Sequence, residues 1–79
     1  MTIITKREYE VLKLIANGYS NEEILNTLVI AQATLKAHIH NLYKKLAVKH
    51  TIDNGSMRVR LALKYWQKQY DVKRNKKVT

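Results

Sequence analysis

The sequence contains no cysteine, no proline and no phenylalanine, and only two of its 79 residues are glycine. Without cysteine the chain forms neither a disulfide framework nor a thiolate metal site, which fits a reducing compartment. No apolar run approaches the roughly 20 residues that span a bilayer, and the start, MTIITKREYE, lacks the apolar segment of a signal peptide. We therefore expect a cytoplasmic protein without a membrane segment.

Acidic residues are scarce and unevenly placed, although the formal net charge of the chain is +9. Residues 1–30 carry three Lys or Arg against four Glu, whereas residues 31–79 carry twelve Lys or Arg against two Asp. A chain of this length forms one small domain that buries only about 60% of its unfolded surface. The basic half favours nucleic acid as a partner, with an anionic membrane surface as the rival.

The stretch 31–49, AQATLKAHIHNLYKKLAVK, has large apolar residues at spacings of four, three and four. At about 100° per residue they form one narrow stripe on a helix. Small and donor-bearing residues project roughly the opposite way, and such a face suits an anionic surface such as the major groove of DNA. The alternative is an ordinary amphipathic helix with a solvated outer face. The stripe consists of Leu35, Ile39, Leu42 and Leu46, and the outward residues are Ala33, Ala37, His40, Asn41 and Lys44.

Two capping boxes precede this stretch, Thr5-Lys6-Arg7-Glu8 and Ser20-Asn21-Glu22-Glu23. They predict helices over 6–17 and 21–28, with Gly18 as the left-handed residue that closes the first. Val29-Ile30 then predicts an extended step into a third helix over 32–46. A short helix, a turn and a longer basic helix form a helix-turn-helix unit.

The remaining chain predicts a fourth helix over 56–70, which follows the turn-forming Asp53-Asn54-Gly55 and begins after Ser56 as N-cap. The fold class is therefore all-α, with four helices in a domain spanning residues 1–70. Residues 71–79 form a basic tail that we expect to be disordered.

The predicted fourth helix has two apolar stripes, although one is enough to close so small a domain. Met57, Leu61 and Tyr65 form the first stripe. We predict that the second stripe is covered by another copy of the chain in a homodimer. The alternative is that it folds back onto the first helix. This predicted interface consists of Val59, Ala62, Leu63, Trp66 and Tyr70.

The segments TKREYEVLKLIANGYSNEEI and LVIAQATLKAHIHNLYKKLAVK resemble the LuxR/FixJ/GerE-type helix-turn-helix DNA-binding domain, in its stand-alone, GerE-like form. The ordered match covers about residues 3–49. The resemblance implies a third helix in the major groove, with Lys36, Ala37 and His40 facing the bases, and dimerisation through the fourth helix. It also implies a phosphate-contacting set, to which the basic outward face adds Lys44. That set is Ser20, Asn21, Thr34, Asn41, Lys44, Lys45 and Lys49.

Two residues depart from the family pattern without removing the base-facing residues. Ala31 stands where the family has a Ser or Thr N-cap, which forgoes about 1 kcal/mol of capping. Ala47 stands where the family has Gly after the third helix. Either the left-handed closure costs about 1 kcal/mol more there, or the helix runs on.

We therefore expect a sequence-specific transcriptional regulator that binds duplex DNA as a homodimer. We expect no receiver or ligand-sensing segment beside the motif, and we therefore expect control through abundance, a partner or competition at the operator. The alternative function is an adaptor whose helix-turn-helix binds a protein, such as an RNA polymerase subunit or another regulator. In that case the basic half would meet an acidic protein surface.

Catalytic and cofactor signals are weak, so we expect no enzyme and no cofactor. His38 and His40 are two residues apart and point to different sides of a helix, with no carboxylate or cysteine placed to complete a metal site. His38 reads as a partly buried structural residue. No Gly-rich phosphate loop is present. The grouping of Ser56, His50 and Asp53 lacks a nucleophile turn.

Overall fold

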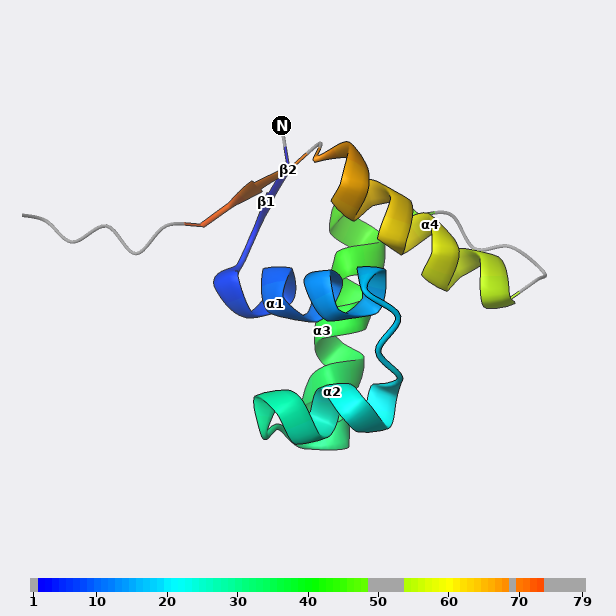
Figure 1. Ribbon diagram of the computed structural model, residues 1–79. Coiled ribbons are helices and arrows are strands. Elements are labelled where there is room, and N and C mark those ends of the chain that lie inside the picture. Colours follow the sequence, from blue (N-terminus) through cyan, green and yellow to red (C-terminus); the bar gives the residue numbers. More distant parts are fainter. Residues whose placement is uncertain (1, 49–53, 69, 74–79) are drawn as a thin grey trace, which may run out of the picture.

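The computed structural model describes residues 2–48, 54–68 and 70–73, with side chains in the fourth helix described from residue 58 onward. This part of the chain contains β1 (Thr2–Ile4), α1 (Lys6–Ala16), α2 (Asn21–Leu28), α3 (Gln32–Lys45), α4 (Asn54–Gln67) and β2 (Tyr70–Val72). α1 packs against α3 and α4, and α2 packs against α3 near its start (Figure 1). The predicted four-helix fold is confirmed, and two short strands are added to it.

Both predicted capping boxes form, which explains why α1 and α2 begin where the sequence places them. The Thr5 N–H donates to Glu8 Oε1 at 2.8 Å, and the Glu8 N–H donates to Thr5 Oγ1 at 3.1 Å. The Ser20 N–H donates to Glu23 Oε1 at 2.8 Å, and the Glu23 N–H donates to Ser20 Oγ at 3.2 Å. Between the two helices Gly18 has φ +86°, the left-handed conformation that glycine adopts without steric penalty.

The boundaries of α4 differ from the prediction at both ends. The helix begins at Asn54, not after Ser56, because the first N–H groups of a helix need no intrahelical partner and tolerate Asn and Gly. It ends at Gln67, and Lys68 turns the chain with φ +54°. The prediction that the helix reaches Tyr70 is therefore wrong. α1 and α3 each end one residue earlier than predicted, at Ala16 and Lys45.

The two ends of the described chain are joined by a parallel pair of strands. Thr2 lies opposite Tyr70, Ile3 opposite Asp71 and Ile4 opposite Val72. The Lys73 N–H extends the pairing by donating to the Ile4 carbonyl at 2.7 Å. Asp71 and Val72, which we expected in a disordered tail, thus belong to the fold. Residues 74–79 of that predicted tail lie outside the described residues, as do Lys49, His50 and Asp53.

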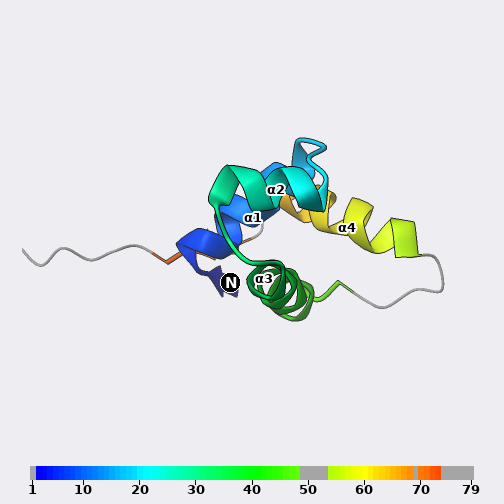
Figure 2. The same cartoon turned by 90° about the horizontal axis from the view of Figure 1, so that it is seen from below.

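The core lies between α1, α3 and α4, and fully buried Ile4 adds β1 to it. Leu35 and Leu42 of α3 are almost completely buried, and Leu61 is the buried contribution of α4. Figure 2, which looks along α3, shows α1 and α2 together on one side of this helix. The opposite side of α3 is covered by no other described element.

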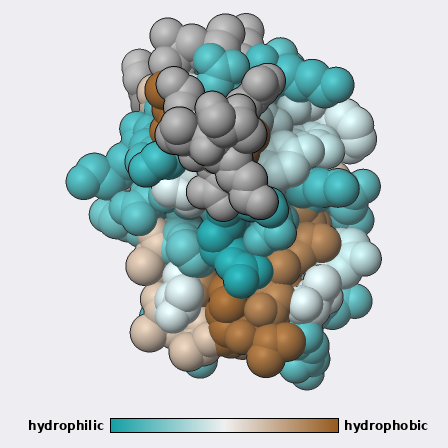
Figure 3. All heavy atoms as spheres, turned by 90° about the vertical axis from the view of Figure 1, so that its left-hand side faces the viewer, coloured by the Kyte–Doolittle hydropathy of each residue, from teal (hydrophilic) through white to brown (hydrophobic). Residues whose placement is uncertain are grey.

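Two residues without a glycine's freedom adopt left-handed backbone conformations at the ends of α2 and α3. Val29 has φ +53°, so the extended step predicted there is wrong, and Ala47 has φ +56°. Of the two alternatives for Ala47, the left-handed closure is the one found. Val29 is strained because it is β-branched, and with 86% of its surface exposed it gains little packing in return. Apolar surface gathers where α2 turns into α3, at the lower edge of Figure 3.

An ion pair connects the first turn of α1 to the last turn of α3. Lys45 Nζ donates to Glu8 Oε1 at 2.8 Å and to Oε2 at 3.2 Å. The Glu8 side chain is only 3% exposed. Burial acts to raise the pKa of Glu8, but the Lys45 ammonium and the Thr5 N–H together hold the pKa below its ordinary value of 4.5. The carboxylate therefore stays ionised inside the fold and holds the end of α3 against α1.

We predict that Val29→Gly stabilises the protein. Glycine removes about 1–2 kcal/mol of strain from the left-handed conformation of the folded state. It also raises the conformational entropy of the unfolded chain, and this offsets roughly half of the gain in stability. The net gain, about 0.5–1 kcal/mol, is measured as a higher midpoint in urea denaturation. Ala37→Gly is the control, because its position is helical and exposed, and it loses about 1 kcal/mol. A loss of stability in Val29→Gly contradicts the strain.

We predict that Glu8→Gln removes a pH-dependent part of the stability. Because the folded pKa of Glu8 is lowered, its contribution is complete above the ordinary, unfolded pKa of 4.5 and is lost as the pH falls through the folded value. At pH 7 the variant is less stable by about 1–3 kcal/mol, and the difference shrinks below about pH 4. Urea denaturation between pH 7 and pH 3 measures this, with exposed Glu22→Gln as the control. A difference that stays constant with pH refutes the ionic role.

Candidate nucleic-acid interface

The uncovered face of α3 carries the small and basic side chains that the sequence placed there. Lys36, Ala37 and His40, the predicted base-reading residues, are all exposed, while Leu35 and Leu42 on the other face are buried. α3 contains no Asp or Glu. His38, which we expected to be partly buried, is half-buried. This helix therefore presents ammonium, imidazole and methyl groups to a partner outside the chain.

The beginning of α3 has free backbone donors. Ala31 occupies the N-cap position and makes no side-chain hydrogen bond to the first turn. The N–H groups of that turn therefore have no side-chain cap and can bind an anion. Thr34 is exposed one turn into the helix, and its hydroxyl is a further donor. The missing cap thus destabilises the start of α3 and leaves its backbone N–H groups available to bind a phosphate.

Ser20 and Asn21, predicted to contact phosphate at the start of α2, are held by neighbours. Ser20 Oγ accepts from the Glu23 N–H, so its own O–H remains able to donate. Asn21 Oδ1 accepts from an Arg58 guanidinium N–H of α4 at 2.8 Å, which leaves the Asn21 amide N–H groups as donors. Arg58 also donates to the Tyr19 carbonyl. The Ser20 hydroxyl and the Asn21 amide are therefore positioned as donors at the start of α2, because the oxygen of each side chain accepts a hydrogen bond from a neighbour.

Arg58 was not among the residues that the sequence pattern singled out. It lies 37 residues from Asn21, and no local spacing relates the two positions. Its hydrogen bonds attach α4 to the turn between α1 and α2. Arg58 is thus a supporting residue for the start of α2, where the sequence predicts phosphate contacts.

Lys45 differs from the other predicted phosphate-contacting residues. Its ammonium is engaged by the buried Glu8 carboxylate, whereas Lys44 is exposed and forms no ion pair among the described residues. The neutral Asn41 side chain is exposed as well. A lysine that compensates a buried carboxylate is not free to neutralise a phosphate without leaving that carboxylate unpaired. The sequence pattern places Lys45 on a flank of the helix and could not reveal a partner 37 residues away. Lys49 lies outside the described residues.

The predicted interface of α4 separates into exposed and packed residues. Val59, Leu63 and Trp66 are 59%, 51% and 59% exposed, so this stripe does not fold back onto α1. Ala62 is half-buried beside them. Tyr70 lies in β2, with its ring centroid 6.3 Å from that of Tyr9, and burial raises the pKa of Tyr70 to about 12. Tyr70 is therefore part of the packed end of the domain and not of the α4 stripe.

The arrangement is suited to binding an anion. Within the described ranges no group of three or more His, Cys, Asp or Glu side chains could hold a metal ion. None of the helices in those ranges has the length and apolarity needed to cross a membrane. The feature that supports anion binding is the basic face of α3, with donors at the starts of α2 and α3.

Comparison with known proteins agrees with this geometry. The sequence model described as "Bacterial regulatory proteins, luxR family" matches residues 2–57. The match therefore covers β1, the helices α1 to α3 and the start of α4. No solved structure matches the chain.

Proposed function

Because the chain belongs to the luxR family of bacterial regulatory proteins, we propose that it reads a specific duplex DNA sequence by placing α3 in the major groove. Membership makes the chain a helix-turn-helix DNA-binding transcription regulator and not an enzyme. The specific site and the oligomeric state are the parts that we add. The observation that carries the proposal is the exposed α3 face of Lys36, Ala37 and His40 opposite a buried leucine stripe.

The three base-facing residues offer different kinds of contact. Lys36 can donate to the O6 and N7 acceptors of guanine, and the Ala37 methyl group can pack against a thymine methyl. His40 offers a ring N–H donor one turn further along. Hydrogen-bond donors around this face suit phosphate contacts, which set the orientation of α3 without reading sequence. These donors belong to Ser20, Asn21, Thr34, Asn41 and Lys44. We assign Lys45 to the ion pair with Glu8 and not to this set.

We further propose that two copies associate through α4. Val59, Leu63 and Trp66 recur at spacings of four and three, so they form one apolar stripe, and each is more than half exposed. A two-fold axis would place this stripe against its own copy. The two α3 helices would then read half-sites about 10 bp apart, or a multiple of that spacing.

We predict that Lys36→Ala and His40→Ala relax base preference. Each variant loses about 1–3 kcal/mol on a duplex selected from a random pool, because a base-edge contact is removed, while binding to random duplex changes less. Titrations of both duplexes at one salt concentration give the two affinities. Equal losses on both count against base reading.

The adaptor alternative is tested by the same wild-type titration. A regulator that binds DNA shifts a random duplex at 50 mM salt, because phosphate contacts are strong at low ionic strength. Absence of any shift favours a protein partner instead.

We predict that Trp66→Ala moves the homodimer toward monomer in sedimentation, because a large exposed aromatic ring is a typical anchor of an interface. Gln67→Ala, at the neighbouring exposed position of α4, serves as the control and leaves the association unchanged. A wild-type protein that sediments as a monomer at high concentration rejects the interface.

A further inference from the structure

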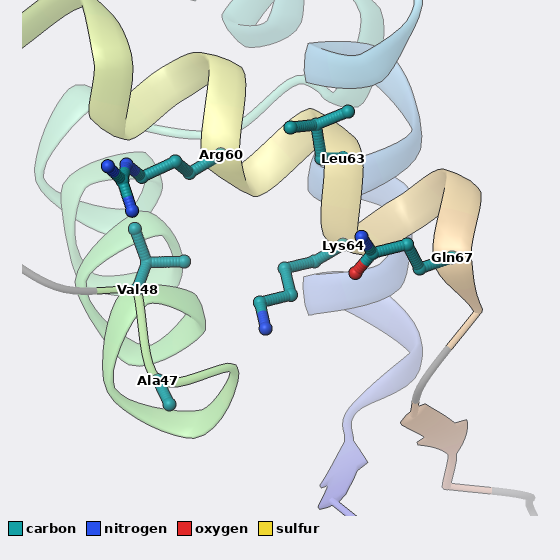
Figure 4. A pocket seen from close by; sticks show the side chains of 6 residues that line it. All are labelled: Ala47, Val48, Arg60, Leu63, Lys64 and Gln67. Carbon is teal, nitrogen blue, oxygen red and sulfur yellow. The ribbon is translucent and has the colours of Figure 1, made fainter.

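A groove of about 350 Å³ lies between the end of α3 and one side of α4 (Figure 4). The groove contains none of the base-facing residues of α3. Leu63 is the residue that it shares with the exposed apolar stripe of α4. Its walls are Ala47 and Val48 from the segment that ends α3, and Arg60, Leu63, Lys64 and Gln67 from α4. We call it the α3–α4 groove.

Two cations define the charge of this groove. Figure 4 shows the side chains of Arg60 and Lys64 extending from α4 toward the segment that contains Ala47 and Val48. The ion pairs between described residues are Arg7–Glu10 and Glu8–Lys45, so neither groove cation has an acidic partner in that part of the chain. α4 itself contains no Asp or Glu. The groove therefore attracts an anion from outside the domain.

The groove continues the basic face of α3. Lys36, His40 and Lys44 follow one another at intervals of four, so they lie on one side of α3. Ala47 and Val48 follow directly after the last turn of the helix, so the groove begins where this basic side ends. At 1.5 Å per residue, Lys36 and Lys45, the last residue of α3, are about 14 Å apart along the axis, whereas the major groove is about 12 Å wide. A helix that contacts bases with its N-terminal residues therefore brings its C-terminal end to the phosphates at the rim.

The lining favours phosphates over a protein helix. Apolar recognition of a helix needs a row of deep anchor sites at successive turns. Here the apolar lining is limited to Ala47, Val48 and Leu63. Only 8% of the Val48 surface is exposed, so this residue offers little contact area. The Lys64 ammonium is a point charge on a flexible stem, and the Arg60 guanidinium is a planar fork that can donate two N–H groups to one phosphate. Both groups suit a row of phosphates.

We propose that the α3–α4 groove binds the DNA phosphate backbone beyond the base-reading contacts, with Arg60 and Lys64 as the residues that neutralise it. This inference rests on the proposed function, because it assumes that α3 occupies the major groove. It extends the DNA-contacting surface from α2 and α3 to a side of α4 that lies next to the apolar stripe. The groove therefore adds affinity for any duplex and no sequence preference.

The test is the salt dependence of binding by an Arg60→Gln, Lys64→Gln double variant of the full chain. Each lost phosphate contact lowers the slope of log K against log salt by about 0.9, so we expect a decrease of about 1.8 and roughly 10- to 100-fold weaker binding near 100 mM salt. Fluorescence anisotropy with a random-sequence duplex between 50 and 200 mM salt measures it. The ratio of affinities for a selected and a random duplex stays unchanged.

A charge-matched control separates local contact from net charge. Lys6→Gln with Lys13→Gln removes the same two charges from exposed positions of α1, and we expect its slope to stay near the wild-type value. Circular dichroism confirms that both double variants are folded. A folded Arg60→Gln, Lys64→Gln protein with the wild-type slope overturns the groove proposal and leaves base reading by α3 intact. If that protein also loses binding to an acidic amphipathic peptide, the groove belongs to a protein partner. A wild-type chain that binds no duplex overturns the proposed function itself.

Discussion

The position of α3 depends on burial of its narrow leucine stripe beneath α1. Leu35 and Leu42 are almost inaccessible to solvent, and Leu46 extends the buried stripe past the last turn. A stripe this narrow fixes the orientation of the helix about its own axis. A rotation by about 100° would expose the leucines and bury ammonium and imidazole groups. The outward direction of Lys36 and His40 thus follows from the packing of leucines on the far side. The Glu8–Lys45 pair adds the axial constraint, since it ties the end of α3 to the first turn of α1.

The parts of the fold that the sequence predicted are those encoded by neighbouring residues. The capping boxes at Thr5 and Ser20 and the left-handed Gly18 each involve residues at most three apart, so their chemistry is visible in the sequence. The direction of the α3 face was predictable for the same reason, because helical periodicity relates residues three and four apart. What the face binds is supported by family membership and by its charge.

The parts that the sequence did not predict depend on contacts between distant residues. β1 and β2 pair the two ends of the described chain, and neither three-residue strand has an alternating pattern long enough to recognise. The partner of Lys45 lies 37 residues away, so a lysine that the helical wheel places on a flank of α3 proved to compensate a buried carboxylate. The end of α4 was misplaced because Lys68 leaves the helix through a left-handed conformation that its residue type does not signal.

α4 connects surfaces that a sequence pattern treats as separate. Leu61 anchors it in the core, and Arg58 holds the Asn21 amide at the start of α2. The turn between α2 and α3 lacks comparable support, because Ala31 provides no cap and Val29 is strained. The start of α2 is therefore held from outside that turn, by Arg58 of α4. A partner copy packed on the exposed stripe of α4 would restrict the same helix that carries Arg58, so association and the arrangement of DNA-contacting donors are mechanically linked in the proposed homodimer.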